Sequence, residues 1–250
     1  MIVYLRLFKL NKFIKKKKLE EKDSEKLRTV EVPDEFKIQF KAAEEKVAKH
    51  FDLLEWAPEM GRILIGGERY ILIRASAMRL GFPEAIAAML ELEGGINNPY
   101  IVKLIYQLAK SLGKSDAKKF HLSMGFDDPI DKLSTGPIHF AYTGWAKVSI
   151  KSESNPSPDE NYFLIYTHPQ SFEADSYIMT RGENSNLPIC IMNAGYSSGW
   201  CSESFGLELD ARELTCRAKG DKECLFIMTP SDKLEDKVKE YLTKLSENQE

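Results

Sequence analysis

The four cysteines of this 250-residue chain all lie within one stretch of 35 residues in its C-terminal part. Three of them combine with a glutamate in the pattern Cys190-x22-Glu213-x2-Cys216-x7-Cys224. Zinc binds thiolate sulfur, also accepts a carboxylate oxygen, and completes a tetrahedral shell with four such ligands. The spacing therefore predicts a zinc site made by these four residues. A shell closed by protein ligands leaves no position for a reactive water, so the predicted role of the metal is structural.

Two other interpretations of the cysteines stay open on spacing alone. Free thiols are often small buried hydrophobes, and an interval of seven residues between cysteines is not a standard zinc-finger spacing. A disulfide is the second alternative, but the N-terminus does not resemble a secretory signal peptide, which favours a reducing, cytoplasmic location. Cys201 fits no ligand position and is expected to be a packing residue.

The metal ligands need a hairpin and a helix to position them. Leu207 to Arg217 and Cys224 to Met228 are predicted strands, joined at the turn residues Lys219-Gly220-Asp221. One hairpin would thus present three ligands, and Cys190 would arrive at the start of a helix over Ile191 to Phe205. The last helix is expected to begin at Pro230, because proline is favoured at the first helical position.

The preceding residues alternate between helical and strand patterns. The predicted elements are a helix from Pro33, a hairpin over 61–73, a helical stretch over 75–92, a long helix from Asn98 to Gly113 or Gly125, strands at 140–150 and 162–167, and a short helix over 171–179. Strands grouped into hairpins and flanked by helices indicate an α+β fold with an antiparallel sheet. The zinc-stapled hairpin would close it at the C-terminal end.

Composition excludes some classes of function. A net charge of −3 argues against direct nucleic-acid binding, which usually needs a basic face. No apolar run approaches the ~20 residues that cross a bilayer. Residues 1–14 place Val3, Leu7, Leu10 and Ile14 on one helical face among lysines. Residues 1–18 could bind a membrane surface weakly, or could instead be an oligomerisation helix or a solvated terminus.

Several ordered motifs carry a resemblance to a known family. They are Gly61-Arg-Ile, Arg69, Ala75-Ser-Ala, Lys114-Ser-Asp-Ala, Gly136-Pro with Gly144, Ser171-Phe-Glu-Ala, Pro188-Ile-Cys, Gly195-Tyr with Gly199, Glu213-x2-Cys216 and Gly220-Asp-x2-Cys224. Together they resemble the aromatic-effector sensor domain of phenol- and toluene-responsive NtrC-type activators, which closes with a 4-vinyl-reductase-type small-molecule-binding domain. The Cys-Glu-Cys-Cys spacing matches the zinc ligands of that family without a gap.

The resemblance implies a dimeric sensor that binds a small aromatic or hydrophobic molecule in a buried pocket beside zinc. It divides the chain into a basic segment and linker over 1–32, the sensor domain over 33–230 with its zinc-binding part at 160–230, and an amphipathic helix over 231–250. The ATPase and DNA-binding domains of those activators are absent from this sequence. A stand-alone signalling protein that passes its signal to a regulatory partner is therefore expected.

The predicted pocket departs from the family pattern. Alignment on Gly136-Pro and Gly144 puts Phe140 where phenol sensors carry a histidine, and His168 falls where they carry a tryptophan. His139 would point to the opposite face if this segment were a strand. Phe140, His168, Trp200 and Tyr196 are the predicted ligand-binding residues, although Phe140 and Trp200 are also ordinary core residues in type.

Enzymatic function has little support in the sequence. No phosphate-binding loop or G-x-G-x-x-G motif occurs, and none of the four histidines is tied to Cys201 by a motif. The alternatives to a sensor are a tetrapyrrole-pathway reductase-like enzyme or accessory protein, and a structural adaptor without ligand.

Overall fold

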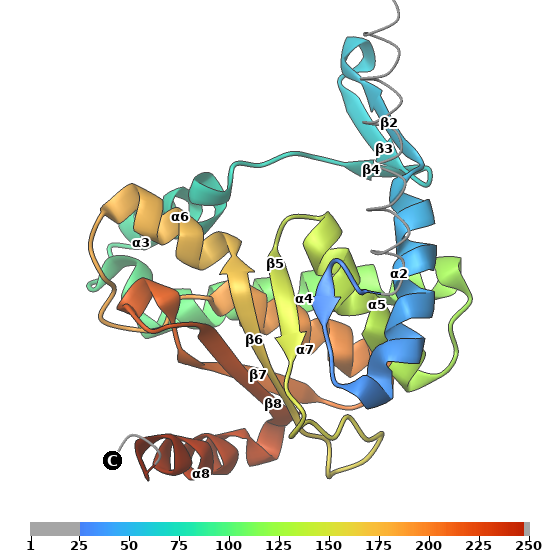
Figure 1. Cartoon of the computed structure of the whole chain (residues 1–250). Helices are drawn as coiled ribbons and strands as arrows, with labels where there is room; N and C mark the ends of the chain where they lie inside the picture. The colour runs from blue at the N-terminus through green and yellow to red at the C-terminus, as the bar shows by residue number, and fades with distance from the viewer. Residues whose placement is uncertain (1–25, 248–250) are drawn as a thin grey trace, which may run out of the picture.

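The computed structural model describes residues 26–247, which form an α+β fold with two separate sheets (Figure 1). Sheet A has the strand order β1-β5-β6-β8-β7, with β1 at Val30–Glu31, β5 at Ala146–Ile150, β6 at Leu164–Ser171, β8 at Cys224–Pro230 and β7 at Leu209–Thr215. Its neighbours are antiparallel except that β1 pairs with β5 in parallel. The expectation of a wholly antiparallel sheet is therefore wrong at this edge. A strand of two residues is too short to show an alternation pattern.

The inner strands of sheet A are buried on both faces. On β8, Cys224, Phe226 and Met228 belong to the main core, whereas Leu225 and Ile227 pack with α8 (Leu234–Glu247) on the other face. This alternation follows the two-residue period of a strand. It places the side chains of one face of β6 and β8 toward the helices that carry the rest of the site.

Three helices cover the inner face: α4 (Pro99–Met124), α5 (Pro129–Tyr142) and α7 (Ile191–Phe205). Helices α4 and α7 approach each other backbone to backbone. A Cβ on Gly199 would lie 2.0 Å from the carbonyl oxygen of Lys110, and one on Gly113 would lie 2.2 Å from that of Tyr196. The absence of side chains at these glycines permits the approach and fixes α7 on α4.

The remaining helices flank this body. They are α2 (Lys37–Phe51), a π-helical turn at Ala77–Gly81 leading into α3 (Phe82–Met89), and α6 (Phe172–Arg181). The predicted helix from Pro33 is confirmed with a short 3-10 turn before it, and the long helix ends at Gly125 in the left-handed conformation.

Sheet B is a three-stranded arm that stands apart from the body (Figure 1). It comprises β2 (Leu54–Ala57), β3 (Arg62–Ile65) and β4 (Glu68–Tyr70), all antiparallel. The arm and the chain beside it expose large apolar side chains, among them Trp56 and Leu72 at 59% and 74%. The predicted hairpin over 61–73 is thus confirmed, but its apolar residues do not join the core.

Two element predictions are wrong. The strand predicted to start at Phe140 begins only at Ala146, because residues 129–142 are helical behind Asp128, whose carboxylate accepts from the backbone N–H of Ile130 at 2.8 Å. Pro230 does not start a helix but ends β8, and a 3-10 turn over Ser231–Lys233 precedes α8. At the end of a strand, the missing N–H of proline costs no ladder bond.

The amphipathic pattern of residues 1–14 lies outside the described residues. Among helices within 26–247, none has the length and apolar content needed to cross a membrane.

Candidate metal centre and internal cavity

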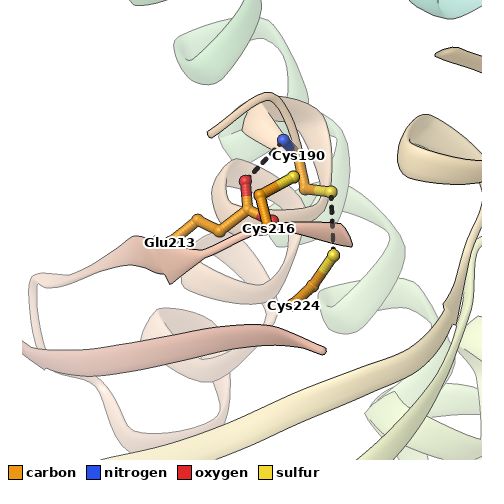
Figure 2. A group of neighbouring side chains, drawn as sticks. All are labelled: Cys190, Glu213, Cys216 and Cys224. Carbon is orange, nitrogen blue, oxygen red and sulfur yellow. Dashed lines mark hydrogen bonds between the residues drawn. The ribbon is translucent and has the colours of Figure 1, made fainter. Parts of the chain in front are cut away.

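The structure brings the four predicted metal ligands together (Figure 2). Cys190 is the residue before α7, Glu213 lies on β7, Cys216 follows β7, and Cys224 begins β8. Their ligand atoms all lie within 4.8 Å of one another, and all four residues are buried. The hairpin turn that returns the chain to Cys224 contains Gly220 with φ +96°, as its turn sequence predicted.

The donor geometry fits a tetrahedral zinc ion. The sulfur atoms of Cys190 and Cys224 are 3.7 Å apart, far beyond a disulfide bond. Two thiolates bound to one zinc at about 2.3 Å would be roughly 3.8 Å apart at the tetrahedral angle. The Oε2 atom of Glu213 accepts a hydrogen bond from the Cys190 N–H at 2.7 Å, whereas its Oε1 is buried and has no partner within the described chain. That oxygen is a free ligand atom facing the cluster.

The electrostatics of the cluster also favour a cation. Burial raises the pKa of Glu213 and of Cys190 well above their ordinary values, whereas hydrogen bonds from Cys190 and Cys224 lower the pKa of Cys216. The backbone N–H of Arg217 donates to the Cys224 sulfur at 3.3 Å. A buried group of acidic donors arranged around one point is stabilised by a bound cation.

A buried ion pair that sequence analysis missed holds the helix next to the cluster. Glu173 on α6 is fully buried and accepts from the backbone N–H groups of Met192 and Asn193, at 3.1 and 2.8 Å. These N–H groups belong to the first turn of α7, directly after Cys190. Arg79, from the π-helical turn, lies 3.6 Å from the same carboxylate. Burial raises the pKa of Glu173 to about 7. Its place in the Ser171-Phe-Glu-Ala motif was the only signal in the sequence.

A small apolar cavity of about 30 Å³ lies between α5, α7 and sheet A. Its lining residues are Leu133, Gly136, Pro137, Phe140, Val148, Ile150, Leu164, Tyr166, Tyr196, Ser197, Trp200 and Cys201. Three of the four predicted ligand-binding residues are therefore at its wall.

The fourth, His168, lies one layer behind the lining. Its ring is 5.9 Å from that of Phe140 and 5.4 Å from that of Tyr166, centroid to centroid. The residue is completely buried, and neither ring nitrogen has a hydrogen-bond partner in residues 26–247. Burial lowers the pKa of His168 to about 3, so the ring is neutral at physiological pH.

Tyr166 is the cavity residue that sequence analysis overlooked. Its hydroxyl oxygen is buried and has no hydrogen-bond partner in the described chain, and burial raises its pKa well above the ordinary value. The signal was available, because Leu164, Tyr166 and His168 alternate along β6 and so share a face. Cys201, expected to be a packing residue, is buried at the cavity wall and is not part of the metal cluster.

His139 faces a different direction from Phe140, but for a reason other than the predicted one. Both lie on α5, where successive side chains are about 100° apart. His139 packs against Trp200 and Phe120, at ring distances of 5.0 and 5.1 Å, whereas Phe140 turns toward His168.

The comparison with known families decides what the metal-bearing segment is. Residues 171–230 match the model of the 4-vinyl-reductase domain family. This segment is a 4-vinyl-reductase-type domain. It contains α6, α7 and the hairpin of β7 and β8, and with them all four predicted metal ligands. The resemblance noted in the sequence is thereby confirmed.

The 4-vinyl-reductase-type domain and the chain before it also share their arrangement with solved structures. The phenol-responsive sensory domain of the transcription activator PoxR, bound to phenol, superposes with a TM-score of 0.64 at 22% identity, over 80% of this chain and 94% of that one. This likeness shows a common fold. A trafficking protein particle complex subunit 3 from Naegleria fowleri, bound to palmitic acid, reaches a TM-score of only 0.43 at 10% identity, over 62% of this chain and 93% of that one.

One curated relative is similar in sequence. The phenol regulator MopR from Acinetobacter guillouiae is 25% identical over 154 residues, which are 55% of this chain. The matched region spans 27% of the length of that regulator.

Proposed function

We propose that the protein is a zinc-stabilised sensor that binds a small aromatic molecule in the cavity beside helix α7 of the 4-vinyl-reductase-type domain. The observation that carries this proposal is the pairing of an apolar cavity with two unpartnered polar side chains of the described chain, His168 and Tyr166. Buried polar groups are normally hydrogen-bonded, so an unpartnered pair beside a cavity suits a polar group on a bound molecule. The phenol-binding relatives point to the same ligand class.

The size of the cavity limits the ligand. A cavity of about 30 Å³ is smaller than the ~150 Å³ that holds benzene in an engineered protein core. A ligand with one ring must therefore separate the side chains of Phe140 and Tyr166. That movement would expose His168, which lies directly behind both rings. A neutral imidazole can donate one hydrogen bond and accept one, as a ligand hydroxyl requires.

Zinc in this proposal supplies a structural cross-link and no chemistry. Cys190, Glu213, Cys216 and Cys224 would hold it, joining the start of α7 to the final hairpin. Tyr196, Trp200 and Cys201 stand on α7, so the metal would stabilise one wall of the cavity.

We expect His168→Ala and Tyr166→Phe each to weaken binding of phenol, used as a probe, by about tenfold. Losing one hydrogen bond to a buried polar group costs about 1.5 kcal/mol. The measurement is a calorimetric titration of purified, zinc-loaded protein. Tyr162→Phe is the matched control, because Tyr162 is equally buried just before the same strand but does not line the cavity. An unchanged phenol affinity in His168→Ala would remove His168 as the anchor.

We also propose that the sensor acts as a homodimer through the arm of sheet B. A three-stranded sheet with exposed apolar side chains is rarely stable alone, and Trp56 on β2 is one of the side chains that a partner would cover. Native mass spectrometry under reducing conditions should show a dimer with one zinc per chain, and Trp56→Glu should shift it to monomer. A folded, metal-free monomer of the unmutated chain would contradict both parts of the proposal.

A change in the cavity on ligand binding would pass to a regulatory protein partner. The competing functions separate experimentally. A structural adaptor would bind no aromatic molecule, and a reductase would consume a bound substrate when a reductant is added.

A further inference from the structure

One side chain separates the cavity from a much larger cleft on the surface. Beneath the arm, a cleft of about 820 Å³ is bounded by sheet B, the end of α2, α4 and α5. Tyr196 lines this cleft and also lines the cavity, and in the described residues no other side chain lines both. Tyr196 itself is only 2% exposed.

We propose that this cleft is the entrance for the ligand of the cavity and that Tyr196 is its gate. This inference rests on the proposed function, because it concerns the route to the same cavity. The walls of the cleft suit a small aromatic molecule, since they include Phe51, Tyr70, Phe120 and Trp145. A weakly held aromatic would thus be concentrated next to the gate.

A hydrogen bond holds the gate closed. The hydroxyl of Tyr196 donates to the Oδ2 atom of Asp116 at 2.7 Å, and Nδ1 of His139 lies 3.5 Å from the same hydroxyl. Asp116 is exposed on α4 and lines the cleft. The tyrosine ring packs between Trp145 and Phe140, at centroid distances of 4.6 and 5.0 Å. The polar end of the gate therefore faces the cleft, and its ring closes the cavity.

The opening movement must be a rotation of the Tyr196 side chain. The residues on either side along α7, Gly195 and Gly199, are in backbone contact with α4, and a Cβ on Gly195 would lie 2.3 Å from the carbonyl oxygen of Tyr106. A helix packed this closely cannot shift without losing those contacts. The cleft offers the space into which the ring can turn.

Cys201 provides a test that needs no ligand, because its side chain lines the cavity and is 4% exposed. Burial raises the pKa of this thiol to about 12, so it reacts slowly and only with a reagent that enters. The probe is methyl methanethiolsulfonate, which is small and neutral. The rate of single modification at Cys201 is followed by peptide mass spectrometry in the zinc-loaded full chain at one fixed pH.

We expect Asp116→Ala and Tyr196→Phe to accelerate modification of Cys201 about tenfold, the factor set by losing one charged hydrogen bond. Asp116 is exposed, so its replacement leaves the core intact. Tyr106→Phe is the matched control: its hydroxyl also bridges α4 to an aspartate, donating to Asp210 at 2.8 Å, but Tyr106 lines neither the cavity nor the cleft beneath the arm. The control should modify at the unmutated rate.

Two results would overturn the gate. One is an unchanged rate in both gate variants, which would mean that the reagent enters elsewhere, for instance past the partly exposed Ser197. The other is an equal acceleration in Tyr106→Phe, which would mean general loosening of the α4–α7 contact.

Phenol titrations separate this inference from the proposed function. If phenol binds, stopped-flow mixing should show association and dissociation both accelerated in Asp116→Ala with a nearly unchanged Kd, because a gate alters only the barrier. If phenol does not bind while Cys201 modification still depends on Asp116, the proposed ligand is wrong and the gate stands.

Discussion

Replacing Cys216 by serine is expected to yield protein that contains no zinc and is largely insoluble. The binding free energy of a structural zinc is roughly 10–16 kcal/mol, and the whole stability of a domain is about 5–15 kcal/mol. A thiolate lost from the cluster would also leave Glu213 and Cys190 buried as acidic groups without their cation. Folding should therefore fail before ligand binding can be measured.

Metal analysis and the soluble yield of Cys216→Ser test this expectation. Cys201→Ser is the matched control, since Cys201 is equally buried but lies outside the cluster. The control should remain soluble and carry one zinc per chain. A well-folded, metal-free Cys216→Ser protein would exclude a structural role for zinc.

The second large effect is expected at the buried ion pair. Glu173→Ala should lower the free energy of unfolding by about 4 kcal/mol, because it leaves Arg79 buried without a partner. It also removes the acceptor for the N–H groups of Met192 and Asn193 at the start of α7. Urea unfolding of the zinc-loaded protein at pH 8, above the raised pKa of about 7 at which Glu173 ionises, measures the loss.

Two further variants give this experiment its controls. Glu84→Ala breaks an ion pair with Arg181 in which both side chains are more than 40% exposed, and should cost less than about 1 kcal/mol. The double variant Arg79→Met with Glu173→Ala should recover part of the loss, since no unpaired charge remains buried. A loss as small in Glu173→Ala as in Glu84→Ala would show that the carboxylate does not hold α7.

Local signals explain the correct predictions of structure. The long helix to Gly125, the hairpin over 61–73 and the helix over Ile191–Phe205 each carry their own periodicity and their own turn residues. The segment before Thr143 was mistaken for a strand because Gly136-Pro137 suggested an interruption. Leu133, Pro137 and Phe140 nevertheless repeat at helical spacing and line the cavity together. This error reversed the expected reason for the orientation of His139.

The sequence by itself determined the metal cluster. Its donor atoms belong to residue types with a definite chemistry, and three of the four ligands lie within one hairpin, so short-range turn geometry brings them together. The family resemblance extended that prediction to a ligand-binding domain.

Only the tertiary structure decided which residues surround the cavity, which carboxylate holds α7, and that Tyr196 faces both cavity and cleft. Those relations join residues many positions apart, such as Leu133 with Cys201 and Arg79 with Glu173. They depend on how helices and sheet pack, to within the rotation of one residue. No local pattern of the chain encodes that rotation, because it is set by contacts that exist only after the elements have come together.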